Sequence, residues 1–480
     1  GARAPLAQAA HSHGSEHGAR VCACARARRH WATTGMKART VQVWLLFGAR
    51  LLCQSNRLSL GGLMPLLAGE LGLSIQSKGQ LLAAFPLGYM FTQVLGGAAS
   101  DRFGGKPVMA LALASVGLGT LLLGGLGSFA AMWATMLVMG VMEGPSFPTG
   151  GVILGRWVPA AERATATAVS DAGGPVGALV ALFLTPLLAA QVGWRLTLVF
   201  NGVYTLAFVA LWLRLAASDP RSCTYITGGE LGELTAAGVL VGSAAAIGKP
   251  QAPGAAMPWR ILWLPSVWAV FIGHIAFNYN RYLMYNWIIT YYTDALRVPV
   301  AEAGLYMFWP NFFDALLSFG VGRAADALAA SGRVSTLSTR RVFAALGFLG
   351  TGVGAALLPL ADSPAAATVL VTFASSMQAC HNGGFKSSYG DLSREYSGFL
   401  RGIGNTLGTG SSFVVPMLAA WLLELGGGST EKVAWQAVFR SVLACSIVGT
   451  GCFVALVSTE NVDAGLSVAA TSRKDAKKEK

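Results

Sequence analysis

Charged side chains are scarce in this chain, and acidic ones are the scarcest. Only 12% of the 480 residues are Asp, Glu, Lys or Arg, and 54% are hydrophobic, whereas soluble domains average about 25% charged residues. This composition excludes a water-soluble protein. The 35 basic residues outnumber the 22 acidic ones and give a net charge of +13, but they gather in the tails and short loops. We read this pattern as membrane topology and predict no nucleic-acid partner.

Cysteine is also sparse, and the seven cysteines are scattered. They show neither a disulfide framework nor zinc-ligand spacing, because Cys22 and Cys24 supply two ligands at most. No nucleophile triad, metal-ligand cluster or phosphate-binding loop is recognisable. We therefore predict no metal, no cofactor and no enzymatic activity.

Long apolar stretches dominate the rest of the chain. Twelve reach the roughly 20 residues that cross a bilayer core, and hydrocarbon tolerates little but helices and closed barrels. We predict an all-α membrane protein with twelve transmembrane helices. The stretches are Val41 to Leu67, Gly79 to Ala99, Pro107 to Leu126, Ala130 to Leu154, Ala164 to Ala190, Leu196 to Leu215, Pro265 to Tyr292, Val300 to Gly322, Val342 to Leu360, Ala366 to Phe385, Phe399 to Leu423 and Val433 to Val457.

A more polar, proline-containing segment separates six stretches from the other six. The predicted organisation is a tail at 1–40, an N-terminal six-helix half at 41–215, a linker loop at 216–264, a C-terminal six-helix half at 265–457 and a basic tail at 458–480. Two such halves form the parallel repeat of a facilitator, with substrate held between them near the midplane.

Basic residues fix the orientation. With both tails cytoplasmic, fifteen Lys and Arg fall in inner loops or adjoining span ends, against five on the outer side. The first 35 residues are rich in Ala, Arg, His and Ser, as in a transit peptide, although Met36 is an alternative start. The predicted location is thus a plastid or other organelle membrane, with the plasma membrane still open.

The strongest local motif lies between the second and third stretches, from Gly97 to Lys106. It resembles the loop signature GxxxDRxGxK of the major facilitator superfamily. Its glycines permit a tight turn, and Asp101, Arg102 and Lys106 can make charge contacts that latch the cytoplasmic side. The segment Gly322 to Asp326 repeats the start of this pattern in the second half, which makes Asp326 a further gating candidate.

A wider resemblance, over nearly all of Val41 to Asp463, is to the anion:cation symporter family, which includes phosphate cotransporters and vesicular glutamate transporters. It implies a secondary active transporter that carries a small anion, inorganic phosphate or an organic anion, by alternating access. It also implies coupling to sodium or protons. We predict a monomer. The matching residues include Asn56-Arg57, Gly88-Tyr89, Glu143-Gly144, Trp157-Val158-Pro159, Gly193-Trp194, His274, Asn278 and Asn405-Thr406.

Charged residues inside spans are costly and usually face a cavity or a partner. Arg57 matches the family's first-span arginine, which binds the anion, and a structural salt bridge is the alternative. Glu143 is a candidate proton-coupling site or, alternatively, an arginine's partner. The resemblance places Tyr89, His274 and Asn278 at the substrate site.

Two departures from the family pattern bear on the substrate. Met136 stands where the glutamate and sialate transporters carry a second arginine, and Ser59 stands where the family prefers Asn. Arg281, in the seventh stretch, is predicted to supply the missing charge or, alternatively, to pair with Asp314 or another buried acid. Two other functions stay open: a facilitator for a neutral or cationic solute, and a non-transporting membrane sensor.

Overall fold

The computed structural model describes residues 36–159, 162–237, 239, 259–393, 397–460 and 462. The predicted N-terminal tail up to residue 35, with its transit-peptide and start-site alternatives, and nearly all of the predicted basic tail lie outside the described residues. Every regular element that the structure describes is helical. The predicted all-α architecture is confirmed.

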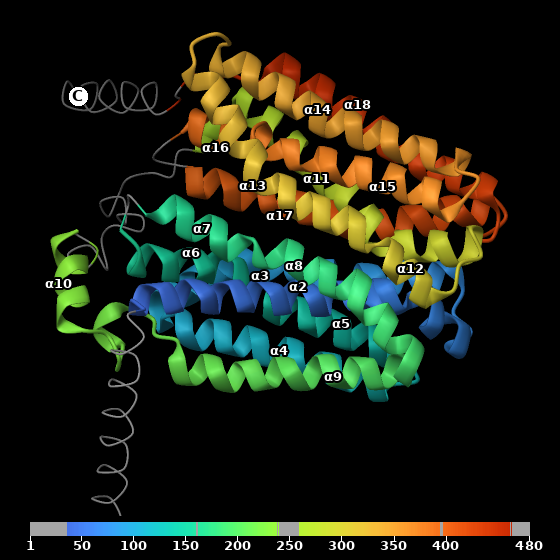
Figure 1. The fold of residues 1–480 in the computed structure, drawn as a ribbon, viewed down its shortest axis with the longest axis horizontal. Helices are drawn as coiled ribbons and strands as arrows, with labels where there is room; N and C mark the ends of the chain where they lie inside the picture. The colour runs from blue at the N-terminus through green and yellow to red at the C-terminus, as the bar shows by residue number, and fades with distance from the viewer. Residues whose placement is uncertain are drawn as a thin grey trace, which may run out of the picture.

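The first half of the chain forms one helical bundle, coloured blue to green in Figure 1. Two of its predicted spans are divided between shorter helices, and α9 contains a break at Gly193, where φ is 81°. Glycine is favoured there because other residues rarely adopt positive φ. The elements are α2 (Ala38–Leu71), α3 (Ile75–Phe103), α4 (Gly105–Gly125), α5 (Phe129–Glu143), α6 (Ser146–Trp157), α7 (Arg163–Asp171), α8 (Gly173–Leu179), η1 (Val180–Leu184) and α9 (Thr185–Leu215).

The second half forms a second bundle, coloured yellow to red in Figure 1. Its tenth predicted span continues beyond the predicted end at Phe385, because a second short helix follows a tight turn. The elements are α11 (Pro265–Thr290), η4 (Tyr291–Ala295), α12 (Val300–Tyr306), α13 (Phe308–Ala330), α14 (Thr336–Leu357), η5 (Leu358–Leu360), α15 (Pro364–Gln378), η6 (Ala379–Asn382), α16 (Phe385–Leu392), α17 (Ser397–Leu425) and α18 (Lys432–Leu456).

The linker contributes η2 (Pro220–Ser222), α10 (Gly228–Ala236) and η3 (Trp259–Trp263). Helix α10 lies at the end of the bundles where α2 begins (Figure 1), which we call the basic end. The carboxylate of Glu230 accepts hydrogen bonds from the backbone N–H groups of Ala38 and Arg39, at 2.8 Å and 2.9 Å. These are N–H groups that a helix leaves unpaired at its N-terminus, so Glu230 ties the linker to α2.

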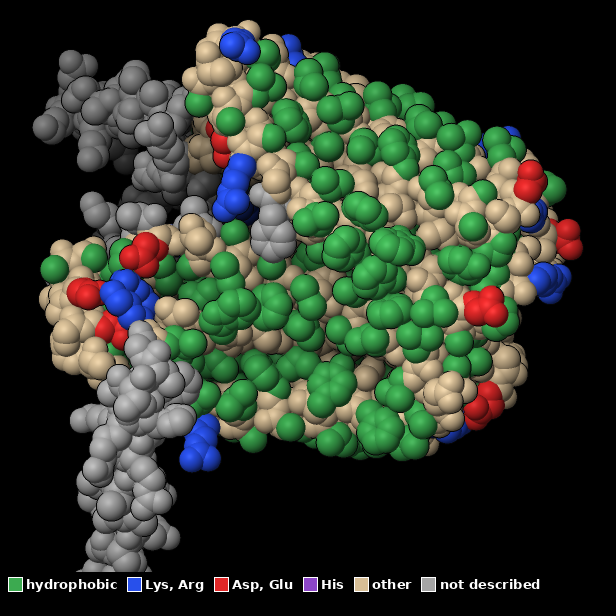
Figure 2. All heavy atoms as spheres, in the orientation of Figure 1, with side chains coloured by type: hydrophobic (Ala, Val, Ile, Leu, Met, Phe, Trp, Pro, Cys, Tyr) green, Lys and Arg blue, Asp and Glu red, His purple; other side chains and the backbone are tan. Residues whose placement is uncertain are grey.

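The outer surface has the pattern expected in a bilayer. Figure 2 shows hydrophobic side chains over the middle of the visible face and charged side chains at its two ends. Five of the described helical segments are long and apolar enough to cross a membrane on their own. The count of twelve crossings stays a prediction.

At the end opposite α10, called here the outer end, the two bundles touch closely. Lys78 Nζ of α3 lies 3.6 Å from Asp294 Oδ2 in η4, and Gln76 donates a hydrogen bond to Glu424 of α17. A Cβ added at Gly79 of α3 would lie 2.7 Å from the Pro416 carbonyl oxygen. The outer end is therefore closed in this conformation.

Candidate functional site

Glycines bring α3 and α5 into backbone contact and so position the first part of the site. A Cβ added at Gly140 would lie 2.1 Å from the carbonyl oxygen of Phe85, and one at Gly88 would lie 2.2 Å from that of Leu137. Such small residues let membrane helices approach closely. The contact places Tyr89 of α3 beside Glu143, the last residue of α5.

Arg57 of α2 occupies the centre of this first cluster. Its Nη2 donates to Glu143 Oε1, and its guanidinium carbon lies 4.6 Å from the ring centroid of Tyr89. Its Nη1 donates to the hydroxyl of Tyr282, 2.9 Å away on α11 of the other half. The structure thus brings Arg57, Tyr89 and Glu143 together. The salt bridge that was the alternative role for Arg57 and Glu143 is formed.

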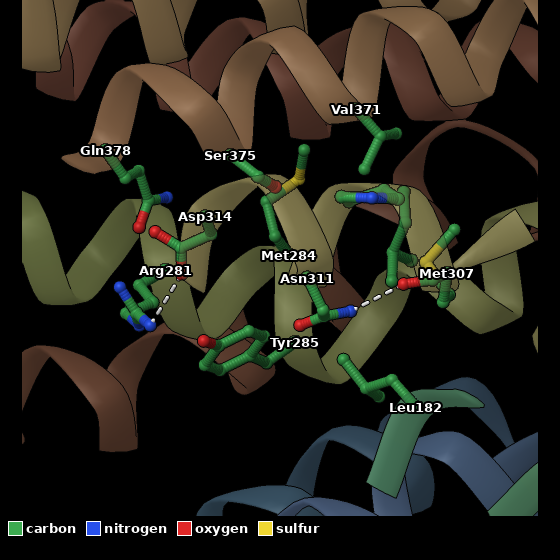
Figure 3. Close-up of a pocket in the computed structure, with 12 residues that line it drawn as sticks. Leu182, Arg281, Met284, Tyr285, Met307, Asn311, Asp314, Val371, Ser375 and Gln378 are labelled. Carbon is green, nitrogen blue, oxygen red and sulfur yellow. Dashed lines mark hydrogen bonds and ion pairs between the residues drawn. The ribbon is translucent and has the colours of Figure 1, made fainter. Parts of the chain in front are cut away.

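Arg281 of α11 forms a second cluster in the C-terminal half. Its Nη2 donates to Asp314 Oδ2 of α13 at 3.0 Å, the ion pair that Figure 3 marks with a dashed line. Gln378, the last residue of α15, lies near the same carboxylate (Figure 3). These residues line a cavity of about 20 Å³, which is space for a water molecule. The alternative considered for Arg281, a salt bridge with Asp314, is therefore also formed.

The two clusters occupy equivalent places in the two halves. The dipeptide Asn-Arg occurs in α2, as Asn56-Arg57, and again in α11, as Asn280-Arg281. Each asparagine donates to a hydroxyl on the last long helix of its own half: Asn56 to Thr205 at 2.9 Å, and Asn280 to Ser446 at 2.9 Å. The halves of a facilitator are related by such a repeat.

The carboxylate, however, lies on a different helix in each half. Helices α5 and α15 are both 15 residues long, and they end in Glu143 and in Gln378 respectively. Tyr89 and Asp314 lie equally far from the starts of α3 and α12. Each half therefore holds one arginine, one carboxylate and one neutral polar group, with the carboxylate on a different helix.

His274 and Asn278 lie on the same stripe of α11 as Arg281, since their spacing of three and four residues places them on one face. His274 Nδ1 is 2.9 Å from the hydroxyl of Tyr389, toward the basic end. Neither residue has a described ion pair. They lie one and two helical turns from Arg281 toward the basic end, and their substrate contact stays a prediction.

The predicted gating residues lie at the basic end, away from the clusters. The side chain of Asp101 lies outside the described residues, and Arg102 is exposed with its guanidinium 5.3 Å from the Phe103 ring centroid. The carbonyl oxygen of Lys106 accepts a hydrogen bond from Trp212 Nε1 at 3.0 Å. Asp326 Oδ1 lies 3.5 Å from Arg340, which also donates to Asp391 at 2.7 Å.

In each of the two clusters, the negative charge of the carboxylate balances the positive charge of the arginine. Glu143 has 1% and Asp314 has 8% of its side chain exposed, and each is paired with an arginine. Burying such a charge is costly unless it is paired. One oxygen of each carboxylate, Glu143 Oε2 and Asp314 Oδ1, has no hydrogen-bond partner. Each site therefore keeps an acceptor that a proton or a ligand hydroxyl can satisfy.

At the outer end, a further arginine–carboxylate contact is structural. Glu70 accepts hydrogen bonds from Trp194 Nε1 at 2.6 Å and from Arg195 Nε at 3.0 Å. These bonds hold the pKa of Glu70 below its usual range.

Among the described residues, no group of three His, Cys, Asp or Glu is placed to hold a metal ion.

Sequence reasoning missed two residues that the structure places beside the clusters, Tyr282 and Lys386. Tyr282 follows Arg281 directly, and the repeated Asn-Arg dipeptide is the signal that could have drawn attention to this part of α11. Lys386 is one of the fifteen basic residues that the sequence analysis places in inner loops or adjoining span ends, but its amine lies 4.4 Å from the ring centroid of Phe277, within the C-terminal bundle.

Comparison with known proteins finds plant anion transporters among the similar sequences. A rice protein (Oryza sativa subsp. japonica) named probable anion transporter 4, chloroplastic, is 29% identical over 85% of this chain and 66% of its own length. From Arabidopsis thaliana, probable anion transporter 3, chloroplastic, is 31% identical over 82% of this chain and 74% of its length. The ascorbate transporter, chloroplastic, of the same plant is 28% identical over 86% and 73%.

The Major Facilitator Superfamily profile matches residues 46–416. A bacterial homologue of the human lysosomal transporter Spinster, solved in an inward-facing and occupied conformation, superposes with a TM-score of 0.64 over 88% of this chain and 96% of its own. At 14% identity this likeness shows the fold alone. The chain belongs to the Major Facilitator Superfamily, and the anion transporters among its relatives confirm the resemblance to the anion:cation symporter family.

Proposed function

We propose that this protein is a secondary active transporter that carries a small anion across a membrane by alternating access. In this proposal, two six-helix halves, residues 41–215 and 265–457, rock about a central site. Arg57 and Arg281 bind the anion from opposite halves. The plastid envelope is the proposed membrane, since the relatives named above are chloroplastic.

The observation that carries the proposal is the matched pair of half-buried arginines, each paired with a buried acid. Both lie on the first helix of their half, and Arg57 reaches across to Tyr282, the neighbour of Arg281. An anion that contacts both guanidinium groups gains more as the halves close, because Coulomb attraction is stronger where water is excluded. Binding then favours the conformational change that transport requires.

We propose protons as the coupling ion, from the pairing of each arginine with a carboxylate. An anion that takes the guanidinium of Arg57 leaves Glu143 buried without its counter-charge. Protonation of Glu143 removes this cost. The same exchange applies to Asp314 when an anion takes Arg281. Anion and proton therefore bind together, so the proposed transport is proton symport. Coupling to sodium is the alternative that the uptake assay tests.

The basic-end residues Asp101, Arg102, Lys106 and Asp326 are proposed to act as a latch and to make no contact with substrate. The ion pairs of Arg340 with Asp326 and Asp391 join α13, α14 and α16 at this end. Since they lie outside the central site, weakening them alters the rate of conformational change and spares the affinity for substrate. Tyr89, His274 and Asn278 complete the proposed site, and no enzymatic step is proposed.

Uptake into proteoliposomes containing the purified protein tests this function. The panel comprises radiolabelled ascorbate, inorganic phosphate, a neutral sugar and choline, each with and without an inward proton or sodium gradient. We expect uptake of an anion that a proton gradient accelerates. Uptake of the sugar or choline alone would establish a neutral or cationic facilitator, and binding without any uptake would establish a sensor.

A further inference from the structure

The cationic side chains between the two halves are not all equally available to an anion. Arg57 and Arg281 form the ion pairs described above, and Arg50 Nη2 lies 3.4 Å from Asp171 Oδ1. Each of these three positive charges is offset by a carboxylate. Lys386 differs from them, because no described carboxylate lies within ion-pair distance of it; its cationic neighbour Arg401, which donates to the Lys386 carbonyl oxygen at 3.4 Å, is exposed.

Lys386 lies at the start of α16, just after the turn that interrupts the tenth predicted span. Its ammonium group donates to Asn382 Oδ1, a neutral acceptor, at 3.1 Å. The side chain is half-buried, and its electrostatic neighbours include Arg281, Asp314 and Arg401 of its own half as well as Asp171 of the N-terminal half. Lys386 is therefore placed between the halves.

Phe277 connects this lysine to the second arginine cluster. The Lys386 ammonium lies 4.4 Å from the Phe277 ring centroid, and the Arg281 guanidinium carbon lies 5.4 Å from the same centroid. Because both distances end at one point, the two cations are within about 10 Å of each other, and such cation–π contacts are favourable. Phe277 lies one helical turn closer to the basic end than Arg281.

We propose that Lys386 is the first binding residue for the transported anion on its path from the basic end. This inference rests on the proposed function. The three arginines Arg50, Arg57 and Arg281 are each paired with a carboxylate, whereas the half-buried Lys386 is not, and the exposed Arg401 beside it adds further positive charge. A carboxylate or phosphate oxygen gains a charge-assisted hydrogen bond there without displacing an acid.

From Lys386, the proposed path of the anion runs one turn along α11 to Arg281. An anion held at Lys386 lies next to the Arg281–Asp314 pair, and it takes Arg281 when Asp314 accepts a proton. Lys386 thus determines how strongly the anion is captured from the basic side, while the arginines determine whether it moves on. Loss of Lys386 should raise the KM for uptake and leave the maximal rate nearly unchanged.

The test compares Lys386→Gln with Lys386→Arg and with Arg333→Gln, a control that removes one positive charge from an exposed position at the basic end of the same half. The proteins are reconstituted with the basic end outward, and the initial uptake of ascorbate and of phosphate is measured. For the anion that wild type carries, we expect Lys386→Gln to raise KM about tenfold, the value of one charge-assisted hydrogen bond. Lys386→Arg and Arg333→Gln should stay within about threefold of wild type.

Anion-dependent thermal stabilisation in detergent is measured in parallel, so that transport and binding are separated. An unchanged KM and unchanged stabilisation in Lys386→Gln, with active wild type, would overturn the role of Lys386 and leave the transport function standing. Absence of wild-type uptake, together with stabilisation by an anion that Lys386→Gln abolishes, would overturn transport but retain the site. Should Lys386→Gln fail to fold, a tenfold rise in KM for Lys386→Arg would likewise contradict the proposal.

Discussion

At the scale of single residues, the first arginine cannot be removed without affecting its carboxylate. Arg57→Ala leaves Glu143 buried and unpaired, and breaking a buried ion pair in this way costs about 3–5 kcal/mol. We expect Arg57→Ala to abolish anion uptake and to lower the melting temperature of the purified protein. The double variant Arg57→Ala with Glu143→Gln should recover the melting temperature and remain inactive. Normal uptake by either protein would remove Arg57 from the site.

The second arginine makes the same contrast possible in the other half. Arg281→Gln should weaken anion affinity about tenfold, because a charge-assisted contact to the anion is lost. It should also lower the melting temperature through Asp314. Adding Asp314→Asn should restore the melting temperature without restoring affinity. If affinity returned together with stability, Arg281 would serve only to hold the bundle together.

The residues themselves show how far sequence reasoning reaches. Arg57 and Glu143 could be predicted because a charge inside an apolar stretch is conspicuous. Their pairing could not, since it depends on the glycine contact between α3 and α5, and the pairing of Arg281 with Asp314 was open for the same reason. Lys386 was assigned to an inner loop or span end because it directly follows the predicted apolar stretch, whereas a further helix, α16, begins at Phe385 and places that half-buried side chain against Phe277.

At the scale of helices, the contact between α3 and α5 should control the site from a distance. A Cβ at Gly140 would lie 2.1 Å from the Phe85 carbonyl oxygen, a backbone atom that cannot turn aside. Gly140→Ala should therefore separate the helices, misalign Glu143 with Arg57 and lower uptake by at least about tenfold. Gly151→Ala in α6 is the control, because nothing lies within 4 Å of a Cβ added there.

Equal uptake by the two glycine variants would show that the α3–α5 contact does not position the site.

The helix boundaries show a related limit of prediction from sequence. The apolar stretches predicted where helices lie, but not that α5 and α15 both end at the level of the clusters. Helix α5 ends just before Gly144-Pro145, and α15 ends at Gln378, where the chain continues as the tighter helix η6. The apolar composition of the two stretches does not distinguish such ends from one continuous helix.

At the scale of the whole molecule, the closed outer end is a distinct state that specific contacts stabilise. Asp294 accepts from Ser429 Oγ at 2.6 Å and from Thr293 Oγ1 at 2.9 Å, and it lies 3.6 Å from Lys78 of the other half. Asp294→Asn removes the charge pair between the halves. We expect the outer-open population to increase, measured as longer distances between spin labels at the exposed positions Ser128 and Leu360 by double electron–electron resonance.

Asp362→Asn provides the control for this measurement, since it removes an exposed acid at the same end. Its distance distribution should match that of the wild type. A distribution in Asp294→Asn that also matches the wild type would mean that other contacts, such as Gln76 with Glu424, suffice to close the outer end.

The most direct measurement of the central claim is concentrative uptake. Proteoliposomes with an inward proton gradient are supplied with radiolabelled ascorbate or phosphate, and the internal and external concentrations are compared over time. The account predicts that one anion accumulates above its external concentration, that the gradient's collapse releases it, and that the Arg57→Ala with Glu143→Gln variant does not accumulate it. Equilibration without accumulation, or accumulation by that variant, would contradict it.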